Sequence, residues 1–120
     1  MPIAREFDPS VVIISSGFDS GAGDEEGFNI TPSGYSNMVA KLKSISAGKV
    51  VLVLEGGYNI PTVSLGLHAC CAELLGLVDH STPLTDNSEG KAAPRTASAA
   101  ARQDVAAAVD VAKEFWSCLQ

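Results

Sequence analysis

The sequence predicts an α/β fold built on parallel strands, and three observations support this. Two apolar runs, residues 11–15 and 50–54, have the length of strands and are rich in β-branched side chains. A stretch with apolar residues at helical spacing lies between them, which is the order of a β-α-β unit. Both runs are apolar at successive positions, a pattern typical of strands covered on both faces. We therefore expect two parallel strands inside a sheet.

A helix is predicted between the two strands. Thr31 followed by Pro32 supplies a capping hydroxyl and a proline suited to the first helical turn. The apolar residues that follow recur at helical spacing: Tyr35, Met38, Val39, Leu42 and Ile45. Gly48 is the expected end of this helix, just before the second strand.

The chain after the second strand divides into three stretches. A second helix is expected from about residue 61 to residue 75, with Gly76 as its stop. Residues 77–96 are rich in Ser, Thr, Pro, Asp and Asn and are predicted to be a flexible connection. Residues 97–120 are alanine-rich and are predicted to be a closing helix whose apolar face includes Trp116. The expected organisation is a main part at 1–76, a connection at 77–96 and a closing helix at 97–120.

Size and composition place limits on this picture. The chain has 120 residues, of which 46% are hydrophobic, so it has the size and core content of one ordinary domain. Two strands alone make a very small sheet, however, and sheets that stand alone generally have three or more strands. We therefore expect the chain to be the end of a larger domain.

The net charge of −6 and the pI near 4.7 argue against a general electrostatic grip on nucleic acid or on an anionic membrane. No apolar stretch approaches the roughly 20 residues needed to span a bilayer. Three cysteines make no disulfide framework, which favours a reducing intracellular location. An acidic surface suits basic substrates such as lysine-rich tails.

Asp19 is the first candidate site residue, because it follows the first strand in a glycine-rich turn. The carboxyl edge of a parallel sheet is where ligands bind in open α/β folds. The carboxylate could be a metal ligand, or it could cap the following turn through backbone amides. The nearby run Asp24-Glu25-Glu26 could hold a hard cation, although such runs are more often solvated loops.

Tyr58 is the second candidate, and it follows the second strand after Gly56 and Gly57. The two glycines could expose the phenol so that it donates a hydrogen bond to a substrate oxyanion. Alternatively, the ring could pack against the next helix. A phosphate-binding loop is disfavoured, because the pattern matches neither the dinucleotide nor the P-loop motif.

The remaining reactive residue types are expected to be structural. His68 and His80 have no spaced partner that would make a metal site. Cys70 and Cys71 lie on an apolar helical stripe and are most simply core residues.

Three segments together resemble the zinc-dependent histone deacetylases, and most closely the class II branch. These segments are PIAREFDP at residues 2–9, ISSGFD at residues 14–19 and LEGGYN at residues 54–59. Their order and spacing are similar to the family across residues 2–76, and the helix that ends in Phe115-Trp116 resembles the family's closing helix more loosely.

The resemblance implies the C-terminal part of an arginase/deacetylase-like parallel-sheet, three-layer fold, with about two strands and three helices in this chain. It implies that Asp19 is one of three Zn²⁺ ligands and that Tyr58 is a catalytic residue that polarises the acetyl carbonyl. It also implies that Gly56 and Gly57 border the substrate.

The resemblance further implies what this chain lacks. The family's other two zinc ligands lie in an Asp-x-His motif, and its catalytic histidines are a His-His pair; neither motif occurs here. The expected function is therefore zinc-dependent hydrolysis of acetyl-lysine amides, with the chain inactive by itself. The alternative is a non-catalytic protein that pairs with an intact deacetylase or its complex. A small cation-binding module, resting on residues 24–26, is a third possibility.

The implied partners are acetylated proteins such as histone tails and, as a possibility, subunits of a deacetylase complex. Direct contact with nucleic acid or a membrane is not expected. The implied location is the nucleus, the cytoplasm or both.

Overall fold

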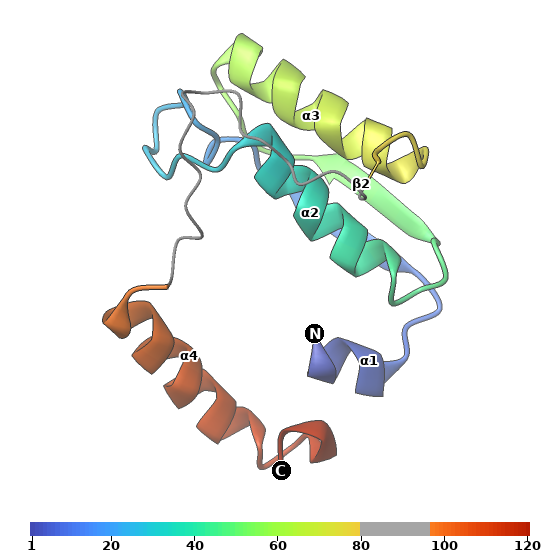
Figure 1. Cartoon of the computed structure of the whole chain (residues 1–120), viewed down its shortest axis with the longest axis vertical. Helices are drawn as coiled ribbons and strands as arrows, with labels where there is room; N and C mark the ends of the chain where they lie inside the picture. Colours follow the sequence, from blue (N-terminus) through green and yellow to red (C-terminus); the bar gives the residue numbers. More distant parts are fainter. Residues whose placement is uncertain (80–96) are drawn as a thin grey trace.

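The computed structural model describes residues 1–79 and 97–120 (Figure 1). The expected connection at 77–96 therefore lies almost wholly outside the described residues, as does His80. The elements, in order, are α1 (Pro2–Phe7), β1 (Val12–Ser16), α2 (Pro32–Lys43), β2 (Val50–Leu54), α3 (Ile60–Leu74), α4 (Ala99–Ala112) and the short 3₁₀ helix η1 (Ser117–Leu119).

The two strands form a parallel pair, which confirms the predicted β-α-β unit. Val12 lies opposite Val50, and the register continues to Ser16 opposite Leu54. The carboxyl ends of both strands therefore reach the same edge of the sheet. Helix α2 makes the crossover between them.

One face of the sheet is covered by α2 and α3, which run side by side across it (Figure 1). The core lies between these helices and the sheet. Its buried residues are Phe18, Tyr35, Val39 and Cys70, with Ile14 and Leu52 of the strands packed against them. The predicted apolar stripes of α2 and α3 therefore face the sheet in part, with Tyr35, Val39 and Cys70 buried but Met38 and Cys71 exposed.

The other face of the sheet is exposed in the described part of the chain, so the expectation that both faces are covered was wrong for this chain. Ile13 of β1 is 68% exposed, and Val51 and Val53 of β2 are also exposed. Successive side chains of a strand point to opposite faces, and the helices packed on this sheet lie on one face. We call Ile13, Val51 and Val53 the open sheet face.

The helix ends match the sequence signals. The Thr31 hydroxyl accepts a hydrogen bond from the Gly34 N–H at the start of α2, and the Asn59 side chain does the same for Thr62 at the start of α3. Gly76, at φ 71°, ends α3 in a Schellman motif, in which the Leu77 N–H donates to the Ala72 carbonyl.

The two ends of the chain differ from the prediction. Helix α1 was not expected, and the closing helix ends at Ala112 and gives way to a turn and η1 instead of running to residue 120. Trp116 lies edge-on to Phe7 of α1, with ring centroids 6.5 Å apart. The Glu6 carboxylate accepts hydrogen bonds from the amides of Ser117 and Cys118 at 3.1 and 2.8 Å. The closing segment is thus fastened to α1, while α4 lies apart from the sheet and from α2 and α3 and has no buried residue (Figure 1).

Candidate functional site

The loops that follow β1 and β2 are joined to each other by backbone hydrogen bonds. The Phe18 N–H donates to the Gly56 carbonyl at 2.7 Å, and the Glu55 N–H donates to the Ser16 carbonyl at 3.0 Å. Asp19 and Tyr58 therefore both follow paired backbone at the same edge of the sheet, as the sequence predicts.

The Asp19 carboxylate lies in a gap between two glycines. A methyl group on Gly56 would lie 2.5 Å from Asp19 Oδ2, and one on Gly17 would lie 2.9 Å from Oδ1. The Ser20 N–H donates to Oδ1 at 3.0 Å, so the carboxylate also caps its own turn. Both functions that the sequence left open for Asp19 are therefore compatible with its position.

Tyr58 presents its side chain to solvent at this edge. The side chain is 72% exposed, so the ring is not packed against α3. Gly57, which precedes it, has φ 132°, and a methyl group there would lie 2.6 Å from Val63 and 3.0 Å from the Phe18 Cβ. Only glycine suits this position, because the backbone conformation and the close packing both exclude a side chain.

Phe18 anchors the loop that carries Asp19 in the core. Its ring is fully buried, 4.8 Å from the ring of Tyr35, whose hydroxyl donates to the Gly17 carbonyl at 3.2 Å. A methyl group on Gly66 of α3 would lie 2.6 Å from Phe18 Cδ1. The residue before Asp19 is thus held in the core, which restricts where the carboxylate can lie.

Asp24 does not lie where its acidic surroundings in the sequence predict. We expected the whole run 24–26 to be a solvated loop or a cation site, yet Asp24 is 8% exposed, while Glu25 and Glu26 are exposed. Its Oδ2 accepts hydrogen bonds from the amides of Tyr58 at 3.0 Å and Asn59 at 2.8 Å. These bonds, with the Asn59 N–H first, hold the pKa of the Asp24 carboxyl below its usual value. A contact across 34 residues leaves no local signal in the sequence.

The other reactive residues are consistent with structural roles. His68 is exposed on α3. Cys70 is buried, as predicted, and burial raises the pKa of its thiol to about 11. Cys71 is exposed, so the prediction that it is a core residue was wrong.

A zinc ion fits the Asp19 carboxylate only in part. The gap between two glycines suits a carboxylate that must stay accessible to a metal, and aspartate oxygen is a normal zinc ligand. Catalytic zinc needs about three protein ligands. Within residues 1–79 and 97–120, no group of three His, Cys, Asp or Glu side chains could hold a metal ion.

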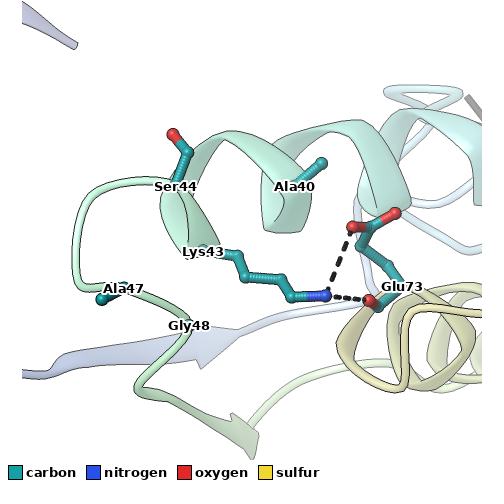
Figure 2. Close-up of a pocket in the computed structure, with 6 residues that line it drawn as sticks. All are labelled: Ala40, Lys43, Ser44, Ala47, Gly48 and Glu73. Carbon is teal, nitrogen blue, oxygen red and sulfur yellow. Dashed lines mark hydrogen bonds and ion pairs between the residues drawn. The ribbon is translucent and has the colours of Figure 1, made fainter.

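An open depression lies at the other end of the α2–α3 pair and has no catalytic arrangement. Figure 2 shows Lys43 reaching across it to Glu73, where Nζ donates to the Glu73 carbonyl at 2.8 Å and lies 3.9 Å from Oε1. The other lining residues are small: Ala40, Ser44, Ala47 and Gly48. Lys43 caps the last turn of α3, so this contact ties the two helices together.

No helix in the described part of the chain is long and apolar enough to cross a membrane.

The chain is similar in sequence to histone deacetylases. Residues 1–74 match the family model for the histone deacetylase domain. Histone deacetylase clr3 of Schizosaccharomyces pombe is 47% identical over 78 residues, which are 64% of this chain and 11% of that protein. Histone deacetylase 15 of Arabidopsis thaliana is 38% identical over 99% of this chain and 20% of its own length. Human histone deacetylase 7 is 35% identical over 100% of this chain and 12% of its own length.

Solved structures agree with the sequence matches. The crystal structure of the HDA15 HD domain superposes with a TM-score of 0.76 at 38% identity, over 98% of this chain and 30% of that one. The structure of the histone deacetylase Clr3 superposes with a TM-score of 0.77 at 33% identity, over 99% of this chain and 18% of that one. The chain thus spans between about a tenth and a fifth of the length of these curated relatives.

Proposed function

The chain belongs to the histone deacetylase family, and on that premise we propose that it is the C-terminal part of a zinc-dependent, class II-type lysine deacetylase domain. The observation that carries the proposal is the pairing of two features at one sheet edge. The Asp19 carboxylate lies between Gly17 and Gly56, and the exposed Tyr58 lies in the loop that follows the adjacent strand, β2.

Asp19 would be the zinc ligand that this chain contributes. When bound, zinc supplies the Lewis acidity that polarises an amide carbonyl and makes water a nucleophile at neutral pH. Burial of Phe18 and the Ser20 amide hold the carboxylate at the edge without covering it. A ligand held in this way needs little reorganisation to bind a metal.

The Tyr58 hydroxyl would donate a hydrogen bond to the acetyl oxygen as negative charge develops there. Removing one such donor costs roughly 10²–10³ in kcat in enzymes where it has been measured. Gly56 and Gly57 would border the acetyl-lysine side chain, because no side chain on either glycine obstructs the approach to Tyr58. The proposed substrates are acetylated proteins such as histone tails, and the proposed location is the nucleus, the cytoplasm or both.

We expect the 120-residue chain to be inactive by itself, because one carboxylate does not make a zinc site. The test is incubation of the purified chain with zinc and an acetyl-lysine peptide, with mass spectrometry of the products. Deacetylation that is lost on Asp19→Ala would contradict the expected inactivity.

The site assignments are tested in a hybrid domain, in which this chain replaces the matching segment of the HDA15 HD domain. Asp19→Ala should remove both bound zinc and activity. Tyr58→Phe should retain zinc and lower kcat by roughly 10²–10³. Glu25→Ala is the matched control, since Glu25 is an exposed carboxylate in the same loop. An Asp19→Ala hybrid that keeps its zinc and its activity would refute the proposal.

The open sheet face favours one second candidate, a non-catalytic protein that pairs with an intact deacetylase or its complex. Ile13, Val51 and Val53 are exposed side by side on it, and apolar patches of this kind mark interaction surfaces. Titration of the purified chain with the intact HDA15 HD domain separates the two functions. Saturable binding that is lost on Ile13→Asp would favour the pairing protein.

A further inference from the structure

We propose that Asp24 is a positioning residue for the Tyr58 phenol in the deacetylase reaction. The inference rests on the proposed catalytic function of Tyr58. It identifies the side chain that holds the backbone of the Tyr58 loop in place.

The Asp24 side chain holds two consecutive backbone groups of the loop that carries the phenol. Oδ2 accepts from the Tyr58 N–H at 3.0 Å and from the Asn59 N–H at 2.8 Å, while Oδ1 accepts from the Glu25 N–H at 2.8 Å. Asp24 is buried, so water competes little for these bonds. Hydrogen bonds to a carboxylate are roughly twice as strong as those between neutral groups.

The Tyr58 loop depends on backbone contacts of this kind, because side chains do little to hold it. Gly56 and Gly57 have no side chains to pack, and glycine gives the backbone its widest conformational freedom. The Tyr58 side chain is exposed, so the ring is not fixed by burial. The backbone direction at Tyr58 therefore decides where the phenol lies, and Asp24 is bonded to that backbone.

A second set of bonds joins the same two loops. The Thr62 hydroxyl donates to the Ala22 carbonyl at 3.0 Å, and the Thr62 N–H donates to the Asn59 side chain at 3.2 Å. The Thr62–Ala22 bond thus ties the loop that contains Asp19 and Asp24 to the chain after Tyr58, and the Phe18 N–H bond to the Gly56 carbonyl ties it to the chain before Tyr58. One connected network sets the position of the phenol relative to the Asp19 carboxylate.

The kinetic test uses the hybrid domain. Asp24→Ala should lower kcat about 10- to 100-fold, less than full loss of the donor, and leave KM for the acetyl peptide within about twofold. Bound zinc should be unchanged, because Asp19 is intact. Asp24→Asn retains an acceptor oxygen and should recover most of kcat. Glu25→Ala again serves as the control and should behave as the parent hybrid.

A double-mutant cycle separates positioning of the phenol from a general structural function. In the Tyr58→Phe hybrid, Asp24→Ala should lower kcat by less than about threefold, because the group that it positions is already absent. An equal loss in both backgrounds would overturn the inference, since it would mean that Asp24 supports the fold and not the phenol.

Amide exchange in the 120-residue chain supplies a readout that needs no activity. Asp24→Ala should make the Tyr58 and Asn59 amides exchange at least about tenfold faster, while amides in β1 keep their protection. Unchanged exchange at both amides would overturn the inference. A Tyr58→Phe hybrid with full activity, or a parent hybrid with none, would instead overturn the proposed function and this inference with it. An impaired Tyr58→Phe hybrid beside a fully active Asp24→Ala hybrid would overturn this inference alone.

Discussion

Replacing Gly56 by alanine tests the gap that holds the Asp19 carboxylate. The added methyl group would lie 2.5 Å from Asp19 Oδ2, so the oxygen must move by about 0.9 Å to reach an ordinary contact of 3.4 Å. The backbone adds no strain, because φ at Gly56 lies outside the left-handed region. Gly17→Ala is the milder change, with its methyl group 2.9 Å from Oδ1 and a required shift of about 0.5 Å.

These shifts are large on the scale of metal coordination. Zinc–oxygen bonds measure about 2.0–2.2 Å, and plausible sites keep their distances within about 0.2 Å. A misplacement of about 1 Å can cost roughly 10² in rate. We therefore expect Gly56→Ala to lower kcat/KM of the hybrid domain about 100-fold and to reduce its zinc content, with Gly17→Ala intermediate.

The assay measures kcat/KM on an acetyl-lysine peptide and zinc by mass spectrometry on the same samples. Gly34→Ala is the matched control, because this glycine lies on α2 and its added methyl group would meet Ile30 at 3.1 Å, away from the carboxylate. Full activity and full zinc content in Gly56→Ala would refute the reasoning, since the carboxylate would then not depend on the gap.

Three further predictions concern the chain itself. Phe18→Ala should lower the free energy of unfolding by about 3–5 kcal/mol in urea titrations followed by circular dichroism, because Phe18 is fully buried, and a loss below about 1 kcal/mol would contradict its core position. Hydrogen bonds from the closing segment lower the pKa of Glu6 to about 2, so the contact should be complete above the usual value of 4.5 and lost as pH falls through about 2. Trp116, the sole tryptophan, should report this loss by fluorescence, and Glu6→Ala should remove the transition. Iodoacetamide at pH 8 should label Cys71 and spare Cys70 until denaturant is added, with peptide mass spectrometry as the readout and early labelling of Cys70 as the contrary result.

Local signals in the sequence predicted the elements that carry the site. Thr31-Pro32 and Gly76 act within a single helical turn, so their meaning does not depend on the rest of the fold. The positions of Asp19 and Tyr58 followed from the parallel order of the strands, because that order brings both strand ends to one edge.

Features that depend on distant contacts were missed. Asp24 reads as part of an acidic surface run, and its burial follows from amides that lie 34 and 35 residues away. Helix α1 is six residues long, and its contacts with the closing segment join residues 111 and 112 positions apart, which leave no local signal in the sequence. The strands carry the composition of buried strands on both faces, yet the described residues cover one face.

The open sheet face has a consequence for the fate of this chain in a cell. Ile13, Val51 and Val53 form the kind of surface that chaperones and proteases recognise in unfinished proteins, and they lie beside unpaired strand edges in the described part of the chain. A copy of the chain that is synthesised without a partner surface to cover the open sheet face should be degraded rapidly or should self-associate. The abundance of the 120-residue chain in a cell would then depend on how quickly a covering surface reaches it as well as on how fast it is synthesised.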